Sequence, residues 1–222
     1  MNFKSNIVIC ALLNIIFLCI LPSISCAQSN LDSLLSQEVS KTEITRKNTN
    51  EILGTLASIY NIPIATEVAD VDINNSTEMQ KLVVENNTVK YVLDAIIKVN
   101  PNYEWIEEDG LIRVRYKNRV TSDPLLDVLI NEIEVDEKSS VEIKQIIADT
   151  PEVRKYLSEM KLEVRSPNSF LGPKSLYPKI KLKLRNYTVR EILDYLIKTE
   201  KFKFWSVSRW GGENKYIRIV LW

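Results

Sequence analysis

The sequence contains no histidine, and its three cysteines, Cys10, Cys19 and Cys26, all lie within the first 26 residues. That stretch has the pattern of a leader that is removed on export, so we expect a working chain without thiol or imidazole groups. This excludes Ser-His-Asp and Cys-His catalysis, structural zinc, haem or iron–sulfur ligation by the usual residues, disulfide bonds and a histidine pH switch. We therefore expect no metal, no cofactor and no catalytic residue. The composition of the full sequence, 45% hydrophobic and 26% charged with no net charge, is typical of a folded globular protein.

Residues 1–27 have the three parts of a secretory signal peptide. Lys4 supplies a positive start, residues 7–21 form an apolar run, and Ser25-Cys26-Ala27 supplies small residues for cleavage. We predict cleavage after Ala27 and a mature chain that is periplasmic or secreted. The first alternative is a membrane anchor, but about 15 apolar residues are fewer than the roughly 20 that span a bilayer. The second is a lipoprotein anchored through Cys26, although Ser23 stands where a lipidated sequence usually has leucine.

The most informative feature is an internal repeat at an offset of one hundred residues. Residues 81–98 (KLVVENNTVKYVLDAIIK) and residues 181–198 (KLKLRNYTVREILDYLIK) are identical at nine of 18 aligned positions. The identical pairs are Lys81/Lys181, Leu82/Leu182, Asn86/Asn186, Thr88/Thr188, Val89/Val189, Leu93/Leu193, Asp94/Asp194, Ile97/Ile197 and Lys98/Lys198. Two tandem copies of one structural unit explain this match.

Each copy has the pattern of a strand followed by a capped helix. Residues 179–185 alternate charged and apolar side chains, which predicts a half-buried strand. Thr188 is a good N-cap with Glu191 as its capping-box partner, whereas Thr88 caps alone because Tyr91 replaces that glutamate. The apolar residues of each helix fall on one stripe: Val89, Val92, Leu93, Ile96 and Ile97, and equally Val189, Ile192, Leu193, Leu196 and Ile197.

Two identical aspartates of the repeat, Asp94 and Asp194, lie off the apolar stripes, and we expect both to be solvated. Hairpins follow the helices, at residues 103–107 with 111–116 and at residues 202–207 with 216–221. Their last strands agree, since Ile112-Arg113-Val114 resembles Ile217-Arg218-Ile219.

The upstream halves have diverged more. In the first copy we predict a strand at 43–46, a helix capped by Asn48 that buries Ile52, Leu53, Leu56 and Ile59 and ends near Tyr60, and a strand at 62–66. In the second we predict a strand at 129–135, a helix that begins at Ser139 with Glu142, another that begins at Thr150-Pro151 and ends at Met160, and a strand at 162–165.

The predicted fold class is α+β, with two tandem small β-α-β-β-α-β-β domains after the cleaved signal peptide. We divide the chain into a signal peptide (1–27), an N-terminal helical segment (28–42, with a helix from Leu31 to about Lys41), a first domain (43–117), a linker (118–124) and a second domain (125–222).

The strand, the Asn-x-Thr turn, the capped helix and the closing hairpin resemble the secretin and TonB short N-terminal domain (STN) family. The resemblance is carried by residues 82–88 with 93–97 and by residues 182–188 with 193–197. It implies a non-enzymatic module of the bacterial cell envelope that docks on a partner protein. Because the sequence ends at Trp222 within the last expected strand, without a segment for a barrel or pore, we expect a free-standing adaptor or accessory subunit of a secretion, transport or signalling system.

A basic stretch suggests an alternative function. Residues 161–203 hold 11 basic and four acidic side chains, including the strand face Lys179, Lys181, Lys183 and Arg185. This face predicts a periplasmic binder of an anionic polymer, either polysaccharide or nucleic acid. The simpler interpretation is a solvated strand face whose charges prevent edge pairing.

Aromatic residues are the other candidates for binding. Trp205 and Trp210 flank the second hairpin and are able to stack on a sugar or a base, although aromatic residues of strands more often pack in the core. The segment 166–178 carries Phe170 and Tyr177 and is either a recognition loop or a simple connection.

A third reading is an enzyme that uses carboxylates alone, at Glu104, Glu107, Glu108 and Asp109. Such a run at a hairpin tip is usually solvated, so we predict that the protein is not an enzyme. The sequence also has neither an RNP-type aromatic-Gly motif nor a Gly-x-x-Gly clamp, and export argues against RNA. We therefore expect an envelope protein rather than a nucleic acid as the partner, and a mature chain that does not span a membrane.

Overall fold

A computed structural model describes residues 31–39, 42–46, 49–70, 80–84, 87–99, 101–117, 123–165, 178–199, 201–210 and 216–222. The protein has an α+β fold in which helices and strands alternate along the chain. Residues 31–35 are helical, and the first repeat then contains β1 (Glu38–Val39), β2 (Thr42–Arg46), α2 (Thr49–Tyr60), β3 (Ile64–Asp70), β4 (Gln80–Val84), β5 (Asn87–Thr88), α3 (Val89–Val99), β6 (Tyr103–Glu108) and β7 (Leu111–Tyr116).

The second repeat follows a short 3-10 helix, η2 (Pro124–Asp127), at the end of the predicted linker. Its elements are β8 (Leu129–Lys138), α4 (Ser140–Asp149), α5 (Pro151–Glu159), β9 (Glu163–Val164), β10 (Ile180–Thr188), α6 (Val189–Lys198), β11 (Phe204–Trp210) and β12 (Tyr216–Leu221). Both repeats therefore contain the helices and closing hairpin that the sequence predicts.

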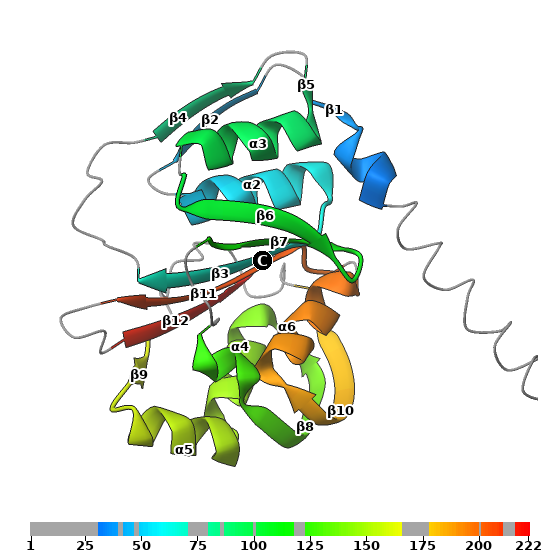
Figure 1. Ribbon diagram of the computed structural model, residues 1–222. Coiled ribbons are helices and arrows are strands. Elements are labelled where there is room, and N and C mark those ends of the chain that lie inside the picture. Colours follow the sequence, from blue (N-terminus) through cyan, green and yellow to red (C-terminus); the bar gives the residue numbers. More distant parts are fainter. Residues whose placement is uncertain are drawn as a thin grey trace, which may run out of the picture.

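Strands of both repeats form one six-stranded sheet in the order β6-β7-β3-β11-β12-β9. The repeats meet where β3 runs parallel to β11, with Ile64 opposite Phe204 and Ala65 opposite Trp205. Helices α2 and α3 and the β2–β4 pair lie on one side of this sheet, and α4 to α6 with the β8–β10 pair lie on the other (Figure 1). A division into two tandem domains does not anticipate this shared sheet.

Each repeat has its own hydrophobic core on one face of the sheet. Strand β12 shows the division, because successive side chains of a strand point to opposite faces. Ile217, Ile219 and Leu221 belong to the core of the second repeat, whereas Val220 and Trp222 pack in the core of the first. The central strands are consequently covered on both faces, which joins the repeats through apolar packing as well as through hydrogen bonds.

Most local predictions for the helices are confirmed. The stripe residues of α3 and α6 are buried, with Ile97 partly so. The capping box of Thr188 and Glu191 forms, and Thr88 Oγ1 accepts a hydrogen bond from the backbone N–H of Tyr91 at 3.3 Å. Pro151 begins α5 as expected. The turn between β6 and β7 has positive φ angles at Asp109 (52°) and Gly110 (77°), which is the backbone that an Asp-Gly hairpin turn requires.

Some predicted extents are wrong. The helix expected up to Lys41 ends at residue 35, because Glu38–Val39 instead form β1 and pair with β5. Ile59 is 55% exposed, since the buried stripe of α2 is centred on Leu53, Ala57 and Tyr60. Strand β9 has only two residues, and β11 begins at residue 204 rather than 202. The predicted N-cap of α2, Asn48, lies outside the described residues.

Candidate functional site

The same aspartate–tryptophan hydrogen bond occurs in both repeats. In the second, the indole Nε1–H of Trp205 on β11 donates to Oδ1 of Asp194 on α6 at 2.9 Å. In the first, Nε1–H of Trp105 on β6 donates to Oδ1 of Asp94 on α3, also at 2.9 Å. The aspartates belong to the 18-residue match, and Trp205 was named as a candidate, but its equivalence with Trp105 and the hydrogen bonds to the aspartates were not predicted. Extending the same offset by seven residues beyond Lys98 and Lys198 would have found that equivalence.

The two copies of this hydrogen bond lie in different surroundings. Asp194 is 8% exposed and Trp205 is fully buried, whereas Asp94 is exposed and Trp105 is partly buried. The prediction that Asp194 is solvated is therefore wrong, because the first repeat covers it. The prediction that Trp205 stacks on a ligand also needs correction, since its ring packs in the core of the second repeat.

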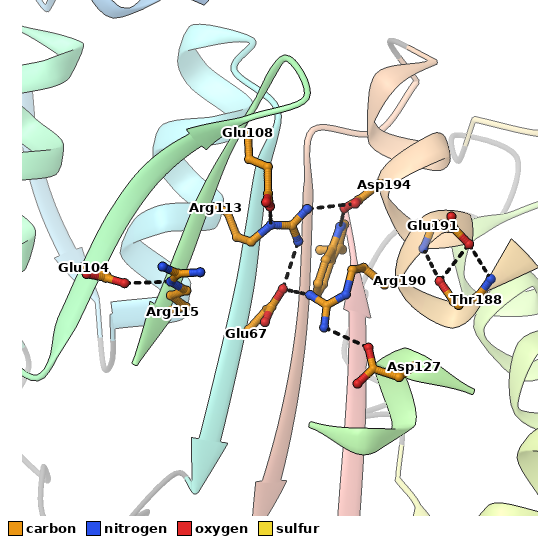
Figure 2. Close-up of polar contacts among 11 residues, drawn as sticks. Glu67, Glu104, Glu108, Arg113, Arg115, Asp127, Thr188, Arg190, Glu191 and Asp194 are labelled. Carbon is orange, nitrogen blue, oxygen red and sulfur yellow. Dashed lines mark hydrogen bonds and ion pairs between the residues drawn. The ribbon is translucent and has the colours of Figure 1, made fainter. Parts of the chain in front are cut away.

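The cover over Asp194 is a buried arginine of the first repeat. Arg113 on β7 has a side chain that is 4% exposed, and its guanidinium donates to Glu67 Oε1 and to Asp194 Oδ2, each at 2.9 Å. Its Nε–H also donates to Glu108 at the tip of the β6–β7 hairpin. Figure 2 shows Arg113 between these three carboxylates, which come from β3, α6 and β6. This one side chain therefore binds both repeats.

A second arginine extends the network. Arg190, on the first turn of α6, pairs with Glu67 and with Asp127 of η2, the latter at 3.3 Å (Figure 2). Two guanidiniums thus face four carboxylates across the boundary between the repeats. We call Glu67, Glu108, Arg113, Asp127, Arg190 and Asp194 the junction network.

The carboxylates of the junction network affect its two arginines differently. Burial opposes the charge of Arg113, but the hydrogen bonds and charges of Asp194 and Glu108 raise the pKa of its guanidinium above the ordinary value. Burial lowers the pKa of Arg190, and the charge of Asp194 acts against that shift. A buried ion pair that loses one partner leaves an uncompensated charge. The arrangement is thus suited to holding two parts of the chain in one position.

A second buried pair anchors the segment between the repeats. Arg209 on β11 donates to Asp123 through Nε at 2.6 Å and through a terminal nitrogen at 2.9 Å, which is a bidentate pair. Arg209 also donates to the hydroxyl of Tyr156 on α5. Asp123 is 3% exposed and caps η2 by accepting from the backbone N–H of Leu125 at 2.9 Å. The start of the second repeat is therefore fixed against its own sheet.

The predicted basic face of β10 is matched by acidic residues on β8. Lys181 pairs with Asp136 at 2.9 Å, Lys183 with Glu134 at 2.7 Å and with Glu132 at 3.4 Å, and Arg185 with Glu132 at 3.1 Å. Hydrogen bonds and charges from these acids raise the pKa values of Lys181 and Lys183. Lys179 is exposed, and its carbonyl accepts from Lys201 Nζ at 2.6 Å. The face is a solvated ladder of ion pairs, as the simpler interpretation predicts.

The structure describes little of the remaining predicted site residues. The backbone of Trp210 ends β11, but its side chain is outside the described part, as are Phe170 and Tyr177. Of the hairpin-tip carboxylates, Glu104 pairs with Arg115 at 2.7 Å and Glu108 with Arg113.

Within the described residues, no group of three or more acidic, histidine or cysteine side chains is arranged to hold a metal ion. Nor does that part of the chain contain a helix of the length and apolarity needed to cross a membrane.

No family model, curated protein or solved structure matches the chain.

Proposed function

We propose that the chain is a non-enzymatic adaptor or accessory subunit of a bacterial secretion, transport or signalling system, and that it acts in the periplasm or outside the cell. The observation that carries this proposal is the junction network. Its central members are buried, and Glu67 and Asp194 each bind Arg113, whereas catalytic carboxylates face a cleft with pKa values tuned for proton transfer. A chain that uses its buried charges to join two repeats is suited to be a scaffold for protein binding.

The signal-peptide pattern of residues 1–27 supports the location. Intact-mass measurement of the exported protein tests it, because cleavage after Ala27 removes a defined mass. A chain that begins at Cys26 and is heavier by two acyl groups would instead be a lipoprotein. A chain that keeps residues 1–27 would contradict export by this leader.

The adaptor role is tested by cross-linking in cells. The tagged chain is expressed with its leader, cross-linked in the envelope fraction and purified. We expect the same envelope protein in replicate captures, and we expect that protein, when tagged, to capture this chain in return. A chain expressed without residues 1–27 is the matched control and should not capture it. Failure of the reciprocal capture, or equal capture by the leaderless control, contradicts the proposal.

Binding of an anionic polymer is the alternative, and β10 lends it little support because Lys181, Lys183 and Arg185 each pair with an acid of β8. Affinity for an oligonucleotide or an anionic polysaccharide that falls steeply with salt would favour it over the adaptor role. Hydrolysis of a glycan by the wild type that is lost in Glu104→Gln would contradict the non-enzymatic proposal.

A further inference from the structure

The contact between the two repeats has two different sides. The second repeat contributes β11 and the Asp194–Trp205 pair, and the first contributes the outer edge of β3 and Arg113, which β7 holds beside it. In this contact Asp194 uses both carboxylate oxygens, since Oδ1 accepts from Trp205 and Oδ2 accepts from Arg113. A complete junction therefore needs an aspartate–tryptophan side and an arginine side.

The first repeat presents the aspartate–tryptophan side a second time. β6 is the counterpart of β11, because Trp105 and Trp205 stand at the offset of one hundred and make the same hydrogen bond. Among the described strands, β6 pairs only with β7, so its other edge carries no neighbour. Asp94 is exposed, and its hydrogen bond with Trp105 uses Oδ1, the same oxygen that Asp194 uses for Trp205. The outer edge formed by β6 thus has the features of β11, but no described strand occupies the place that β3 takes beside β11.

The second repeat presents the arginine side at the opposite end of the sheet. β9 is the counterpart of β3, since Val164 and Ile64 stand at the same offset and lie opposite Ile217 and Ile112 in parallel pairs. In the described part of the chain, β9 pairs only with β12. Arg113 lies one residue beyond Ile112, and Arg218 lies one residue beyond Ile217. Relative to β9, Arg218 therefore has the position that Arg113 has relative to β3.

Arg218 lacks the partners that Arg113 has. Its Nε atom is buried and has no hydrogen-bond partner, which is a costly state for a guanidinium nitrogen. Because Ile217 and Ile219 face the second core, Arg218 points to the other face, where Glu51 of α2 raises its pKa while burial lowers it. The two hairpins differ in their internal register by two residues, since Trp105 lies opposite Val114, whereas Trp205 lies opposite Leu221 and not opposite Ile219, the counterpart of Val114. This difference does not change the pairing of β12 with β9.

The charges at the two ends of the sheet are complementary. β6 carries Glu104, which pairs with Arg115, Glu108, which pairs with Arg113, and Glu107, and α3 adds Asp94 beside it. At the other end, Arg165 follows β9 directly and is exposed, and Arg218 lies next to it in the register. Glu163 is the acidic residue of β9 and pairs with Arg165 at 3.8 Å. Attraction between these ends favours a parallel approach of β9 to β6.

We propose that a second copy of this chain docks head to tail, with its β9 pairing in parallel with β6 and its Arg218 and Arg165 facing Asp94. The internal register places Phe204 opposite Ile64 and Trp205 opposite Ala65, so the offset of one hundred places Glu104 opposite Val164 and Trp105 opposite Arg165. The helices of the two repeats lie on opposite faces of the sheet (Figure 1), and among the described strands β6 and β9 are the outer ones, so each added copy presents the same two edges. Such a heterologous contact leads to open assemblies or rings. The contact does not depend on the adaptor role.

Two variants that each block one end test the proposal. Asp94→Arg blocks the β6 end, and Arg165→Glu blocks the β9 end; both positions are exposed, so circular dichroism should match the wild type. In sedimentation equilibrium the wild type should gain mass with concentration, and each variant alone should stay at the mass of one chain. A mixture of the two should gain mass again, because each chain keeps one intact end and the two reversed charges are opposite in sign.

The outcomes that overturn the proposal are distinct. A wild type that remains at the mass of one chain throughout the concentration series overturns it. So does self-association of Arg165→Glu alone, because that would mean two β6 edges pair symmetrically.

A position-specific disulfide detects a weak contact. Glu104→Cys is mixed with Val164→Cys, both in a background with residues 10, 19 and 26 changed to serine, and the two should cross-link between chains. Equal cross-linking of a Glu159→Cys control with Val164→Cys would show only random collision and would also overturn the proposal.

Discussion

The Asp94–Trp105 pair of the first repeat and the Asp194–Trp205 pair of the second have the same residues, spacing and 2.9 Å hydrogen bond, yet only the second is buried. The difference comes from Arg113, which binds Asp194 from the other repeat. The local sequence thus determines the hydrogen bond, and the neighbouring repeat determines how much that bond stabilises the fold. We expect the aspartate of the second repeat to contribute several-fold more to the free energy of unfolding than the aspartate of the first.

Removing the aspartates should give the largest contrast. Asp194→Ala leaves Arg113 and Trp205 Nε1 short of a buried partner, and we expect a loss of about 3–5 kcal/mol in the free energy of unfolding. Asp94→Ala removes an exposed side chain, and we expect a change within about 0.5 kcal/mol. Urea unfolding followed by far-ultraviolet circular dichroism measures both. Equal losses for the two variants would contradict the unequal burial.

The tryptophans should show a smaller contrast of the same kind. Trp205→Phe leaves a cavity in the second core and removes the donor to Asp194, and we expect a loss of about 2–3 kcal/mol. Trp105→Phe should cost less than half as much because the ring is only partly buried. Urea unfolding, again followed by circular dichroism, gives both values. A Trp105→Phe variant that is as unstable as Trp205→Phe would argue against the asymmetry.

Gly54 on α2 of the first repeat lies against Trp222 of the second repeat. A Cβ atom at this position of α2 would overlap the ring of Trp222, which directly follows β12. We expect Gly54→Ala to destabilise the chain by about 2 kcal/mol, because the ring must move within a packed core. Pairing it with Trp222→Leu should recover part of the loss, as thermal unfolding would show. A stabilising Gly54→Ala would mean that helix propensity outweighs this contact.

The caps of α3 and α6 should give the smallest contrast. Hydrogen bonds from the backbone N–H and hydroxyl of Thr188 lower the pKa of Glu191, so the stability it contributes is present above the ordinary glutamate pKa and is lost as pH falls through its lowered pKa. Glu191→Gln should therefore weaken the acid dependence of unfolding below about pH 4.5, with a loss of less than 1 kcal/mol at neutral pH. Tyr91 occupies the matching place in α3, so Tyr91→Gln should leave that dependence unchanged. Urea midpoints measured at several pH values distinguish the two.

The elements were predictable because their signals are local. Thr188, Pro151 and the Asp109-Gly110 turn act on neighbours within a few residues, and the stripes of α3 and α6 repeat over two turns. The ladder between β8 and β10 also follows from alternation, once two strands of opposite charge are paired. The junction network was not predictable in this way, since Arg113 and Asp194 are 81 residues apart and nothing near either one marks its partner.

By itself, the sequence determined two copies of one strand–helix–hairpin unit, their caps and their apolar stripes, because these depend on periods of two and 3.6 residues and on short-range hydrogen bonds. It also contained two equivalent aspartates and two equivalent tryptophans. Only the tertiary structure decided that β3 and β11 pair, and therefore that Asp194 and Trp205 are buried while Asp94 remains exposed. The physical reason is that burial depends on which distant segment covers a side chain, and identical local sequences are covered differently when one of them lies at the end of the sheet.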